Sequence, residues 1–285
     1  MKGAIYPNFR KEHAFECCDR VCDIMNKIGI EVYMDECYKK EFAHKDYVKY
    51  GHFDDIAEDI DVAVAVGGDG TILKCAKYLV ERDTLLIGIN TGRLGFMSAL
   101  EYDQLEQVEK LLSGGCKVSE RMLLTCKIQN GNDSVYKLRA LNDVTISAAY
   151  SDICDFDVYC DGLNIGSYRA DGAVFSTPTG STAYSLSAGG PIIEPDMKCI
   201  EMTLICPHSL FTRPMIFSPD RRLRFVNTAE DNPELFVSVD GGNPIKLPRG
   251  SSVEITGSKH VIKLADMASN DFFNSLNKKF MRPLK

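Results

Sequence analysis

The chain has 285 residues, of which 45% are apolar and 26% charged, with a formal net charge of −7. This composition excludes a disordered chain and predicts a packed globular protein long enough for two domains. The negative balance, without any block of lysines or arginines, argues against nucleic acid or an anionic membrane as the main partner.

No apolar run reaches the length of about 18 residues that spans a bilayer, and the first residues lack the apolar core of a signal peptide. We therefore expect a cytoplasmic protein. The eleven cysteines are scattered and include no C-x-x-C pair, so free thiols are expected. Cys17, Cys18 and Cys22 fall on neighbouring turns of a predicted helix, but no second ligand pair lies nearby to complete a metal site.

The first hundred residues alternate between predicted strands and helices. Strands are expected at KGAIY, IEVYM, VAVAV and TLLIGIN, amphipathic helices at residues 11–28 and from about Thr71, and a charged insertion at residues 36–53. This alternation predicts a Rossmann-like α/β domain with a parallel sheet. Two of the strands end in glycine-bearing turns, at the edge where open α/β sheets bind ligands.

The first of these turns is Gly67-Gly68-Asp69-Gly70-Thr71. Its glycines let the backbone approach a phosphate, and the following helix N-terminus adds partial positive charge. A carboxylate about 4 Å from a phosphate charge is repelled by about 4 kcal/mol at a dielectric near 20. Asp69 therefore faces either a bridging divalent cation or a hydroxyl that attacks the phosphate, unless it only caps the helix. Because the whole chain is negative, attraction of phosphates requires local amides and cations.

The second turn, from Asn90 to Phe96, reads NTGRLGF. Asn90 can bond the backbone or a ligand. We expect Gly92 and Gly95 to shape the turn rather than to contact a ligand, and Phe96 to pack into the core. The sequence has neither a P-loop signature nor a complete G-x-G-x-x-G motif after its first strand, which disfavours P-loop kinases and dehydrogenases.

A helical stretch at residues 102–112 precedes a change of pattern. From about Lys117 to Ile255, short alternating runs separated by turn residues predict an all-β domain. The tail adds the strand-like run HVIKLA and the amphipathic helix DFFNSLNKKF, a candidate cover for the first domain. We place the α/β domain at residues 1–100, completed by 256–285, and the β-rich domain at residues 101–255.

Several polar residues interrupt the alternation in this second half. Asn142 and Asp143 adjoin in a predicted strand, where the alternative is exposed edge surface. Arg169 suits a phosphate as a fork-shaped donor and Asp171 suits an amine or a ribose hydroxyl, unless the two form a surface ion pair. His208 follows a proline and is interpreted as a turn residue rather than an acid catalyst.

The densest polar segment is TPTGSTAYSLS, from Thr177 to Ser187. Pro178 and Gly180 shape the turn, and the hydroxyls can cap the following helix. Tyr184 is suited to stack on a base. The alternative, with Tyr184 in the core and hydroxyls satisfying the backbone, is weakened because capping needs one hydroxyl and the segment supplies five by Ser185.

Taken in order, GGDGT, NTGRLGF, LND, RADG, TPTGSTAYSLSAGGP, CPHSL and VDGG resemble the NAD kinase family. The likeness runs from about Asp61 to Gly242, and TPTGSTAYSLSAGGP is its most specific part, since GGDGT is shared with lipid kinases and phosphofructokinases. The resemblance implies phosphorylation of the adenosine ribose 2′-hydroxyl of NAD, with ATP or inorganic polyphosphate as donor. It also implies an α/β domain, a β-rich domain, a final segment that folds back, and a homodimer or homotetramer.

Carried over by position, the resemblance assigns Asp69 as proton acceptor and Gly70 as an adjoining phosphate-loop contact. The positions that match dinucleotide contacts are Asn142, Asp143, Arg169, Asp171, Thr182, Ala183, Tyr184 and Ser187. Many family members have glutamate where this chain has the shorter Asp143. The run from Asp240 to Asn243 departs from the family's aspartate-glycine-glutamine, so no contact is assigned there.

The expected mechanism follows from the weak acidity of a ribose hydroxyl. Asp69 orients the hydroxyl and accepts its proton late, in a loose transition state, while glycine amides and Mg²⁺ hold the donor phosphates. A lipid kinase is the nearest alternative enzyme, but it does not explain TPTGSTAYSLS or RADG. A non-catalytic dinucleotide sensor is the second alternative, and the intact Asp69 argues against it.

Overall fold

The computed structural model describes residues 1–92, 95–112, 116–130, 134–149, 152–209, 211–228, 234–266 and 272–280. The chain forms two compact units: Met1–Glu120 together with Ile262–Lys285, and Arg121–Val261. Both boundaries fall inside long strands, β7 (Lys117–Asn130) and β18 (Ser252–Asp266). A boundary inside a strand does not interrupt the pattern of apolar and polar residues, so the sequence does not reveal it. The boundaries predicted from the sequence lie near residues 100 and 255 instead.

The first unit is built on a parallel sheet with the strand order β3-β2-β1-β4-β5. The strand β5 also pairs in parallel with β6 and with the last part of β18. Parallel pairing throughout confirms the α/β domain that the alternation predicts. The strands are β1 (Lys2–Pro7), β2 (Glu31–Asp35), β3 (Lys49–Gly51), β4 (Val62–Gly67), β5 (Leu85–Asn90) and β6 (Leu100–Glu101).

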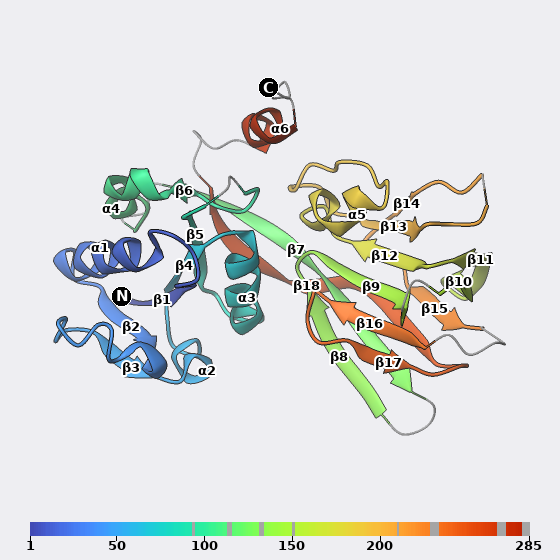
Figure 1. Cartoon of the computed structure of the whole chain (residues 1–285), viewed down its shortest axis with the longest axis horizontal. Coiled ribbons are helices and arrows are strands. Elements are labelled where there is room, and N and C mark those ends of the chain that lie inside the picture. The colour runs from blue at the N-terminus through green and yellow to red at the C-terminus, as the bar shows by residue number, and fades with distance from the viewer. Residues whose placement is uncertain are drawn as a thin grey trace. The chain divides into compact units, whose positions relative to one another are not determined.

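Helices lie on both sides of this sheet (Figure 1). The cysteine-rich face of α1 belongs to the apolar core on one side, together with residues of α4. Outside that core, α3 contacts β4 and β5. The helices are α1 (Ala14–Lys27), η1 (Glu36–Tyr38), α2 (Phe53–Ile56), α3 (Asp69–Leu79), η2 (Tyr102–Gln107), α4 (Val108–Leu112) and α6 (Phe272–Phe280).

The helix α1 begins at Ala14, three residues later than predicted, because His13 has a left-handed backbone with φ 58°. Cys17, Cys18 and Cys22 are buried on its inner face. None of the eleven cysteines forms a disulfide in the described structure, as expected. Burial raises the pKa of Cys17 and of Cys22 to about 12, so these thiols serve as small apolar side chains.

The second unit contains two antiparallel sheets that share one apolar core. One sheet has the order β14-β13-β12-β9-β16-β17, and the other pairs β11, β10, β15 and the first part of β18, with β7 pairing β8. The rings of Phe156 and Phe225, both from the second sheet, are stacked with their centroids 4.4 Å apart. They lie in one apolar cluster with Phe175 from the first sheet. Antiparallel pairing confirms the predicted all-β domain.

The strands of this unit follow the short alternating runs of the sequence, but three of these runs form two strands each, two of them through Asp-Gly turns. The run from Val135 to Ser147 breaks at Leu141 and Asn142, so it forms two strands. The remaining bounds are β8 (Ser134–Ala140), β9 (Asp143–Ala148), β10 (Cys154–Cys160), β11 (Leu163–Ala170), β12 (Gly172–Ser176), β13 (Ile200–Ile205), β14 (Met215–Phe217), β15 (Leu223–Asn227), β16 (Leu235–Val239) and β17 (Ile245–Leu247).

Two Asp-Gly pairs in this unit have consecutive positive φ values. Asp161 and Gly162, at 50° and 89°, form the two-residue turn between β10 and β11. Asp240 and Gly241, at 50° and 62°, end β16. Asp-Gly is the preferred pair for such type I′ turns, because both residues tolerate the left-handed region. Across the described ranges, no helix is both long and apolar enough to cross a bilayer.

Candidate functional site

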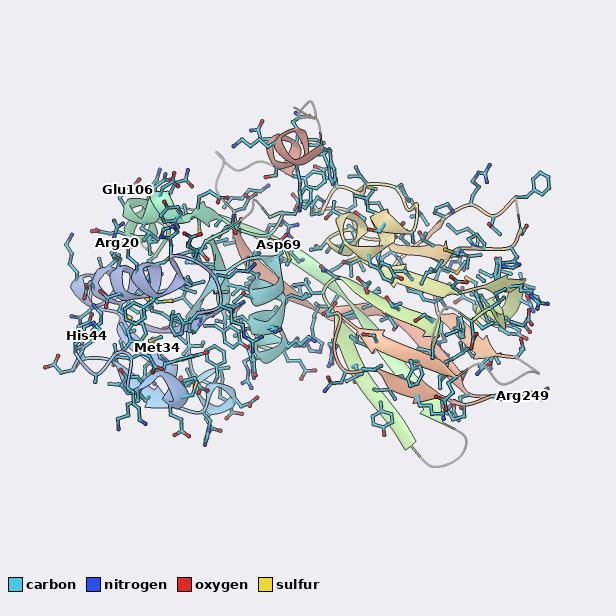
Figure 2. All side chains as sticks on the ribbon, in the orientation of Figure 1. Arg20, Met34, His44, Asp69, Glu106 and Arg249 are labelled. Atoms are coloured by element: carbon cyan, nitrogen blue, oxygen red, sulfur yellow. The ribbon has the colours of Figure 1, made fainter. Side chains whose placement is uncertain are left out.

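Asp69 is the first residue of α3 and lies where the glycine loop leaves β4 (Figure 2). The N-cap position is Gly68, which has no side chain to cap the helix, and Thr71 Oγ1 accepts the Gly68 N–H at 3.5 Å. The Asp69 carboxylate instead accepts the backbone N–H of Phe96 at 2.9 Å and that of Met97 at 3.2 Å. The capping interpretation of Asp69 is therefore wrong, because the turn after β5 holds this carboxylate.

The shape of that turn depends on Gly95. A Cβ atom at Gly95 would lie 2.0 Å from Asp69 Oδ1, whereas one at Gly92 would meet nothing within 4 Å. The expectation that Gly95 shapes the turn is confirmed, and the structure supplies the reason. Arg93 and Leu94 lie outside the described residues.

Contrary to the prediction, Phe96 does not pack into the core. Its side chain is half-buried and packs against α6, with its ring centroid 6.0 Å from that of Phe272 and 5.9 Å from that of Phe280. The Lys279 ammonium lies 4.2 Å from the centre of the Phe96 ring, within cation–π range. The helix α6 thus rests on the same turn that holds Asp69.

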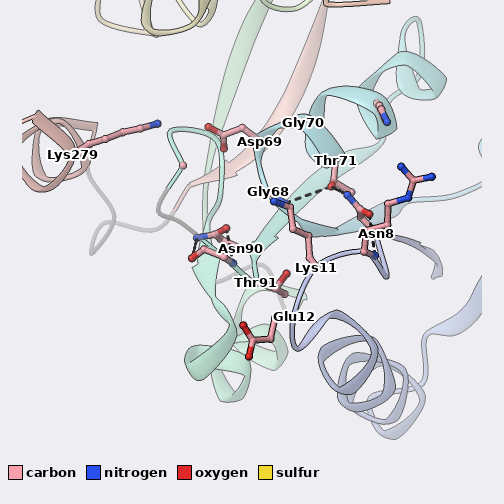
Figure 3. Close-up of a pocket in the computed structure, with 14 residues that line it drawn as sticks. Asn8, Lys11, Glu12, Gly68, Asp69, Gly70, Thr71, Asn90, Thr91 and Lys279 are labelled. Carbon is pink, nitrogen blue, oxygen red and sulfur yellow. Dashed lines mark hydrogen bonds between the residues drawn. The ribbon is translucent and has the colours of Figure 1, made fainter.

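A cavity of about 770 Å³ in the first unit opens beside the glycine loop (Figure 3). Two carboxylates, Glu12 and Asp69, line it together with four cations: Arg10, Lys11, Lys74 and Lys279. This local positive excess occurs in a chain of net charge −7. The cavity therefore meets the requirement that phosphates be attracted by local groups rather than by the field of the whole protein.

One hydroxyl in this cavity is left without a partner. Thr91 lines the cavity with only 4% of its surface exposed, and its Oγ1 has no hydrogen-bond partner within the described part of the chain. By contrast, Thr71 Oγ1 accepts a hydrogen bond from Asn8 Nδ2 at 3.3 Å. A buried hydroxyl without a partner costs free energy unless a ligand or water meets it, so Thr91 marks a binding position.

Asn90 bonds the protein rather than standing free. Its Nδ2 donates to Glu101 Oε2 at 2.7 Å and to the Gly92 carbonyl at 3.3 Å. Burial raises the pKa of Glu101, and the hydrogen bond from Asn90 opposes that rise. Asn90 therefore braces the start of the turn, at Gly92.

The four cations were not identified from the sequence, although a signal for two of them was present. Arg10 and Lys11 follow the carboxyl end of β1, which is the edge where such sheets bind ligands. Lys279 lies at the end of a helix about two hundred residues along the chain from the glycine loop. No local pattern connects that lysine to the loop.

The carboxylates here do not form a closed metal cage. Among the residues described, no group of three or more His, Cys, Asp or Glu side chains is arranged to hold a metal ion. Mg²⁺ usually binds through one or two carboxylates together with substrate phosphates. With Glu12 and Asp69 lining one cavity, the donor set fits an ion that arrives on phosphates.

In the second unit, the residues around Asn142 are held by Asp240. The Asp240 carboxylate accepts the backbone N–H groups of Leu141, Asn142 and Asp143 at 2.9, 2.8 and 3.1 Å. Asp240 thus organises the LND segment from the VDGG turn, a role that its place in the sequence did not reveal. Asn142 Oδ1 is buried and without a partner among the described residues, so it is available to a ligand.

Asp143 is buried, with 7% of its surface exposed, and begins the interior strand β9. The edge-surface alternative for this residue is therefore wrong. Burial and the nearby Asp240 carboxylate raise the pKa of Asp143 to about 6, against a hydrogen bond from Thr145 Oγ1 at 3.0 Å. The Asp143 carboxyl changes its charge within a pH range in which most aspartates stay ionised.

The RADG segment is fixed through its backbone. Asp171 donates its N–H to Ile205 O and accepts from Ala148 N, both at 3.0 Å, and His208 donates its N–H to Arg169 O at 2.9 Å. No ion pair joins Arg169 to Asp171, so the ion-pair alternative is wrong, and within the described part of the chain neither side chain has an ion-pair partner. His208 is exposed in a bend, as expected for a turn residue.

The hydroxyl-rich segment forms η4 (Gly180–Thr182) and α5 (Tyr184–Ser187). Most of its hydroxyls bond the protein itself. Their hydrogen bonds run from Thr177 to Leu141 O, from Ser181 to Pro178 O, from Thr182 to Thr179 O, and from Ser185 to Glu201. The expectation that such density exceeds the needs of the backbone is met in part, because Ser185 bonds a side chain and Thr179 Oγ1 is buried without a partner among the described residues.

The exposed positions of this loop are those assigned to the dinucleotide. Tyr184 has 44% of its surface exposed, so it is not a core residue. Ser187 is also exposed, and Thr182 and Ala183 are half-buried. A Cβ at Gly180 would lie 2.1 Å from Asn142 O. That close approach joins the loop to the LND segment, so two assigned groups of residues meet within this unit.

Comparisons with known proteins agree over nearly the whole chain. Residues 4–115 match the family model for the ATP-NAD kinase N-terminal domain, and residues 141–267 match that for the ATP-NAD kinase C-terminal domain. The NAD kinase of Citrifermentans bemidjiense is 34% identical over 280 residues, covering 98% of this chain and 97% of that relative. The NAD kinase of Caldanaerobacter subterraneus subsp. tengcongensis is 33% identical, covering 98% of each chain.

Two solved structures are similar in fold. Yeast NADH kinase in complex with NADH has a TM-score of 0.91 at 25% identity, covering 100% of this chain and 89% of that one. An NAD kinase from Archaeoglobus fulgidus in complex with ATP has a TM-score of 0.77 at 23% identity and covers 98% of each chain. Both likenesses support the fold described above.

Proposed function

The chain belongs to the NAD kinase family, and we propose that Asp69 and the loop around it carry out the phosphoryl transfer that defines this family. The proposed reaction moves the terminal phosphoryl group of ATP to the adenosine ribose 2′-hydroxyl of NAD, giving NADP and ADP. The observation that carries it is a carboxylate held by two backbone N–H groups beside a cavity with a glycine loop and four cations.

Asp69 is placed to act as the proton acceptor. Each of its oxygens accepts one backbone N–H, which leaves a further lone pair on each oxygen for the ribose hydroxyl. The new bond forms between the 2′-oxygen and the terminal phosphorus, the bond to the bridging oxygen of ATP breaks, and the hydroxyl proton passes to Asp69. A carboxylate is a weak base toward an alcohol, so this transfer occurs late, as a loose transition state allows.

The donor phosphates are proposed to lie in the cavity beside the glycine loop. A Cβ at Gly70 would meet nothing within 4 Å, so its backbone is open to a ligand. Lys11, Lys74 and Lys279 supply positive charge, and the Thr91 hydroxyl can donate to a phosphate oxygen. These groups stabilise charge that develops on the transferring phosphoryl group.

Mg²⁺ is the proposed metal, held by donor phosphates with Glu12 and Asp69 nearby. When bound, such an ion neutralises phosphate charge and polarises the phosphoryl group. Its presence would also offset the repulsion between the donor and these two carboxylates.

The second unit is proposed to bind NAD through the residues that the resemblance assigns. Supporting this are an exposed Tyr184 suited to stacking, an unpartnered Asn142 amide oxygen and a side chain at Asp171 without an ion pair. The yeast relative is named as a kinase complexed with NADH. We also propose a cytoplasmic homodimer or homotetramer, as the resemblance implies.

A coupled assay tests this function. The purified protein is incubated with NAD and either ATP or inorganic polyphosphate, with and without Mg²⁺, and NADP is detected with an NADP-specific dehydrogenase. We expect NADP with at least one donor, and only in the presence of the metal. A lipid mixture offered in place of NAD should remain unphosphorylated.

The same assay identifies the alternatives. Labelled phosphate on a diacylglycerol-type lipid, with NAD unchanged, would replace the proposal with a lipid kinase. Tight NAD binding by calorimetry without NADP from any donor or metal would identify a dinucleotide sensor.

A further inference from the structure

The strand β13 carries a buried carboxylate that phosphoryl transfer does not use. Glu201 is 0% exposed, and among the described residues no lysine, arginine or histidine forms an ion pair with it. Its partners are three hydroxyls. Ser185 Oγ and Thr203 Oγ1 donate to Oε1 at 2.7 and 2.8 Å, and Ser176 Oγ donates to Oε2 at 2.8 Å.

Two of these donors stand at the two ends of the hydroxyl-rich loop. Ser176 is the last residue of β12, directly before Thr177, and Ser185 lies in α5, directly after Tyr184. Both are 0% exposed. One carboxylate therefore ties together the entry and the exit of the segment that presents Tyr184 to solvent.

Gly190 leaves the space that this arrangement needs. A Cβ there would lie 2.0 Å from Glu201 Oε1 and 2.4 Å from Ser185 Oγ. The Gly190 N–H also donates to Ser185 O at 2.9 Å. The second glycine of the SAGGP run thus has a physical reason for its place beside the carboxylate.

Stability alone does not account for a carboxylate at this position. Burying an ionisable group without a partner of opposite charge is unfavourable even when hydrogen bonds surround it. An apolar side chain of similar length would fill the same volume without that cost. What the carboxylate adds is a fixed direction for two hydroxyls, and a satisfied polar network specifies one conformation of the segments it joins.

We propose that Glu201 is a positioning residue for dinucleotide binding: through Ser176 and Ser185 it holds the loop of residues 177–187 in the conformation that receives NAD. The inference rests on the proposed function, since it takes this loop to be the NAD-binding segment. Glu201 itself touches no substrate. Its effect should appear in NAD affinity and not in the chemical step or in use of the donor.

Steady-state kinetics of two substitutions test the proposal. Glu201→Met keeps the length and removes the acceptors, and we expect the KM for NAD to rise about tenfold while kcat and the KM for ATP change less than about threefold. Glu201→Gln keeps one acceptor oxygen and should restore most of the affinity. A KM for NAD within about twofold of wild type in Glu201→Met would overturn the proposal.

A double-mutant cycle separates positioning from general loosening of the fold. If Glu201 holds both ends of the loop, then Ser176→Ala and Ser185→Ala should each raise the KM for NAD, and the double variant should raise it less than about twofold beyond the larger single effect. Fully additive effects would contradict the proposal. The cycle uses only mild substitutions, so it stands even if Glu201→Met does not fold.

The loop can also be observed without any activity. The chain has no tryptophan, so Tyr184→Trp places a single fluorophore on the loop, and its time-resolved anisotropy reports local motion. We expect Glu201→Met in this background to increase fast depolarisation, with Glu201→Gln closer to wild type. An unchanged anisotropy would count against the proposal. This measurement needs no NADP formation, so its failure is distinct from failure of the proposed function.

Discussion

The cavity beside Asp69 and the loop from Thr177 to Ser187 use polar side chains in opposite ways. In the first, a hydroxyl and four cations face the cavity, and the donors to the Asp69 carboxylate among the described residues are backbone N–H groups. In the second, the hydroxyls of Thr177, Ser181, Thr182 and Ser185 are bonded to the protein, whereas Thr179 Oγ1 is buried without a partner among the described residues.

The difference teaches that polar density in a sequence does not by itself mark ligand contacts. The loop from Thr177 to Ser187 uses most of its hydroxyls in hydrogen bonds that fix its own shape. The cavity beside Asp69 instead presents charged side chains to a ligand. Substitutions in the cavity should therefore change catalysis or donor use, and buried substitutions in the loop should first change stability.

The largest effect is expected at Gly95. Gly95→Ala would place a methyl group 2.0 Å from Asp69 Oδ1, and displacing a catalytic carboxylate by about 1 Å can cost about a hundredfold in turnover. Gly92→Ala is the matched control, because its Cβ meets nothing within 4 Å. Steady-state assays should separate the two variants clearly. Equal turnover in the two variants would contradict the role of Gly95 in shaping the turn that holds Asp69.

The next effect concerns stability of the loop. Ser181 is 0% exposed, donates to Pro178 O at 2.7 Å and accepts from Ile193 N at 3.0 Å. Ser181→Ala leaves the Ile193 N–H without its acceptor and removes one of the two donors to Pro178 O, so it should lower the free energy of unfolding by about 2 kcal/mol. Ser187→Ala, at an exposed position, should change it by less than about 0.5 kcal/mol in the same denaturation series. Similar losses in both would contradict the internal role of the hydroxyls.

Lys279 lines the cavity although it lies far from the glycine loop in the sequence. Lys279→Ala removes a cation from the cavity lining, and we expect the KM for ATP to rise about tenfold with the KM for NAD nearly unchanged. The exposed neighbour Lys278 does not line the cavity, so Lys278→Ala serves as the control. If both variants behave alike, the effect comes from net charge and not from the site.

Asp143 gives the smallest effect on stability, and the size of this effect depends on pH. Its pKa is raised to about 6 in the folded protein, so the folded state holds its proton more tightly than the unfolded chain does. Stability from this group is present below about pH 4 and is lost as pH rises to about 6. Asp143→Asn removes that loss but buries an amide, so we expect a net gain of about 1 kcal/mol at pH 7 and none at pH 4.

Thermal unfolding of wild type and Asp143→Asn across this pH range measures the difference. The NAD affinity of the variant, measured separately, should fall if Asp143 contacts the dinucleotide. A stability difference that grows toward low pH would contradict the assigned direction of the pKa shift.

The features of the fold and of the site that could be predicted are those that depend on local sequence patterns. Apolar runs placed the parallel strands, and the glycine loop identified Asp69, because both depend on neighbours in the sequence. Asp240, Lys279 and Glu201 could not be assigned, because each acts on residues reached only through the fold. The break between β8 and β9 was also missed, since Asn142 interrupts a run that is otherwise typical of one strand.

The central claim is that the Asp69 carboxylate accepts the proton of the NAD 2′-hydroxyl. The most direct test is the single-turnover rate of NADP formation by rapid quench, with NAD and ATP saturating, in wild type and Asp69→Asn. The amide oxygen can still accept one of the two backbone N–H groups, so the variant should fold and bind NAD. The account predicts a rate lower by at least about a hundredfold. An unchanged rate in a folded, NAD-binding variant would contradict it.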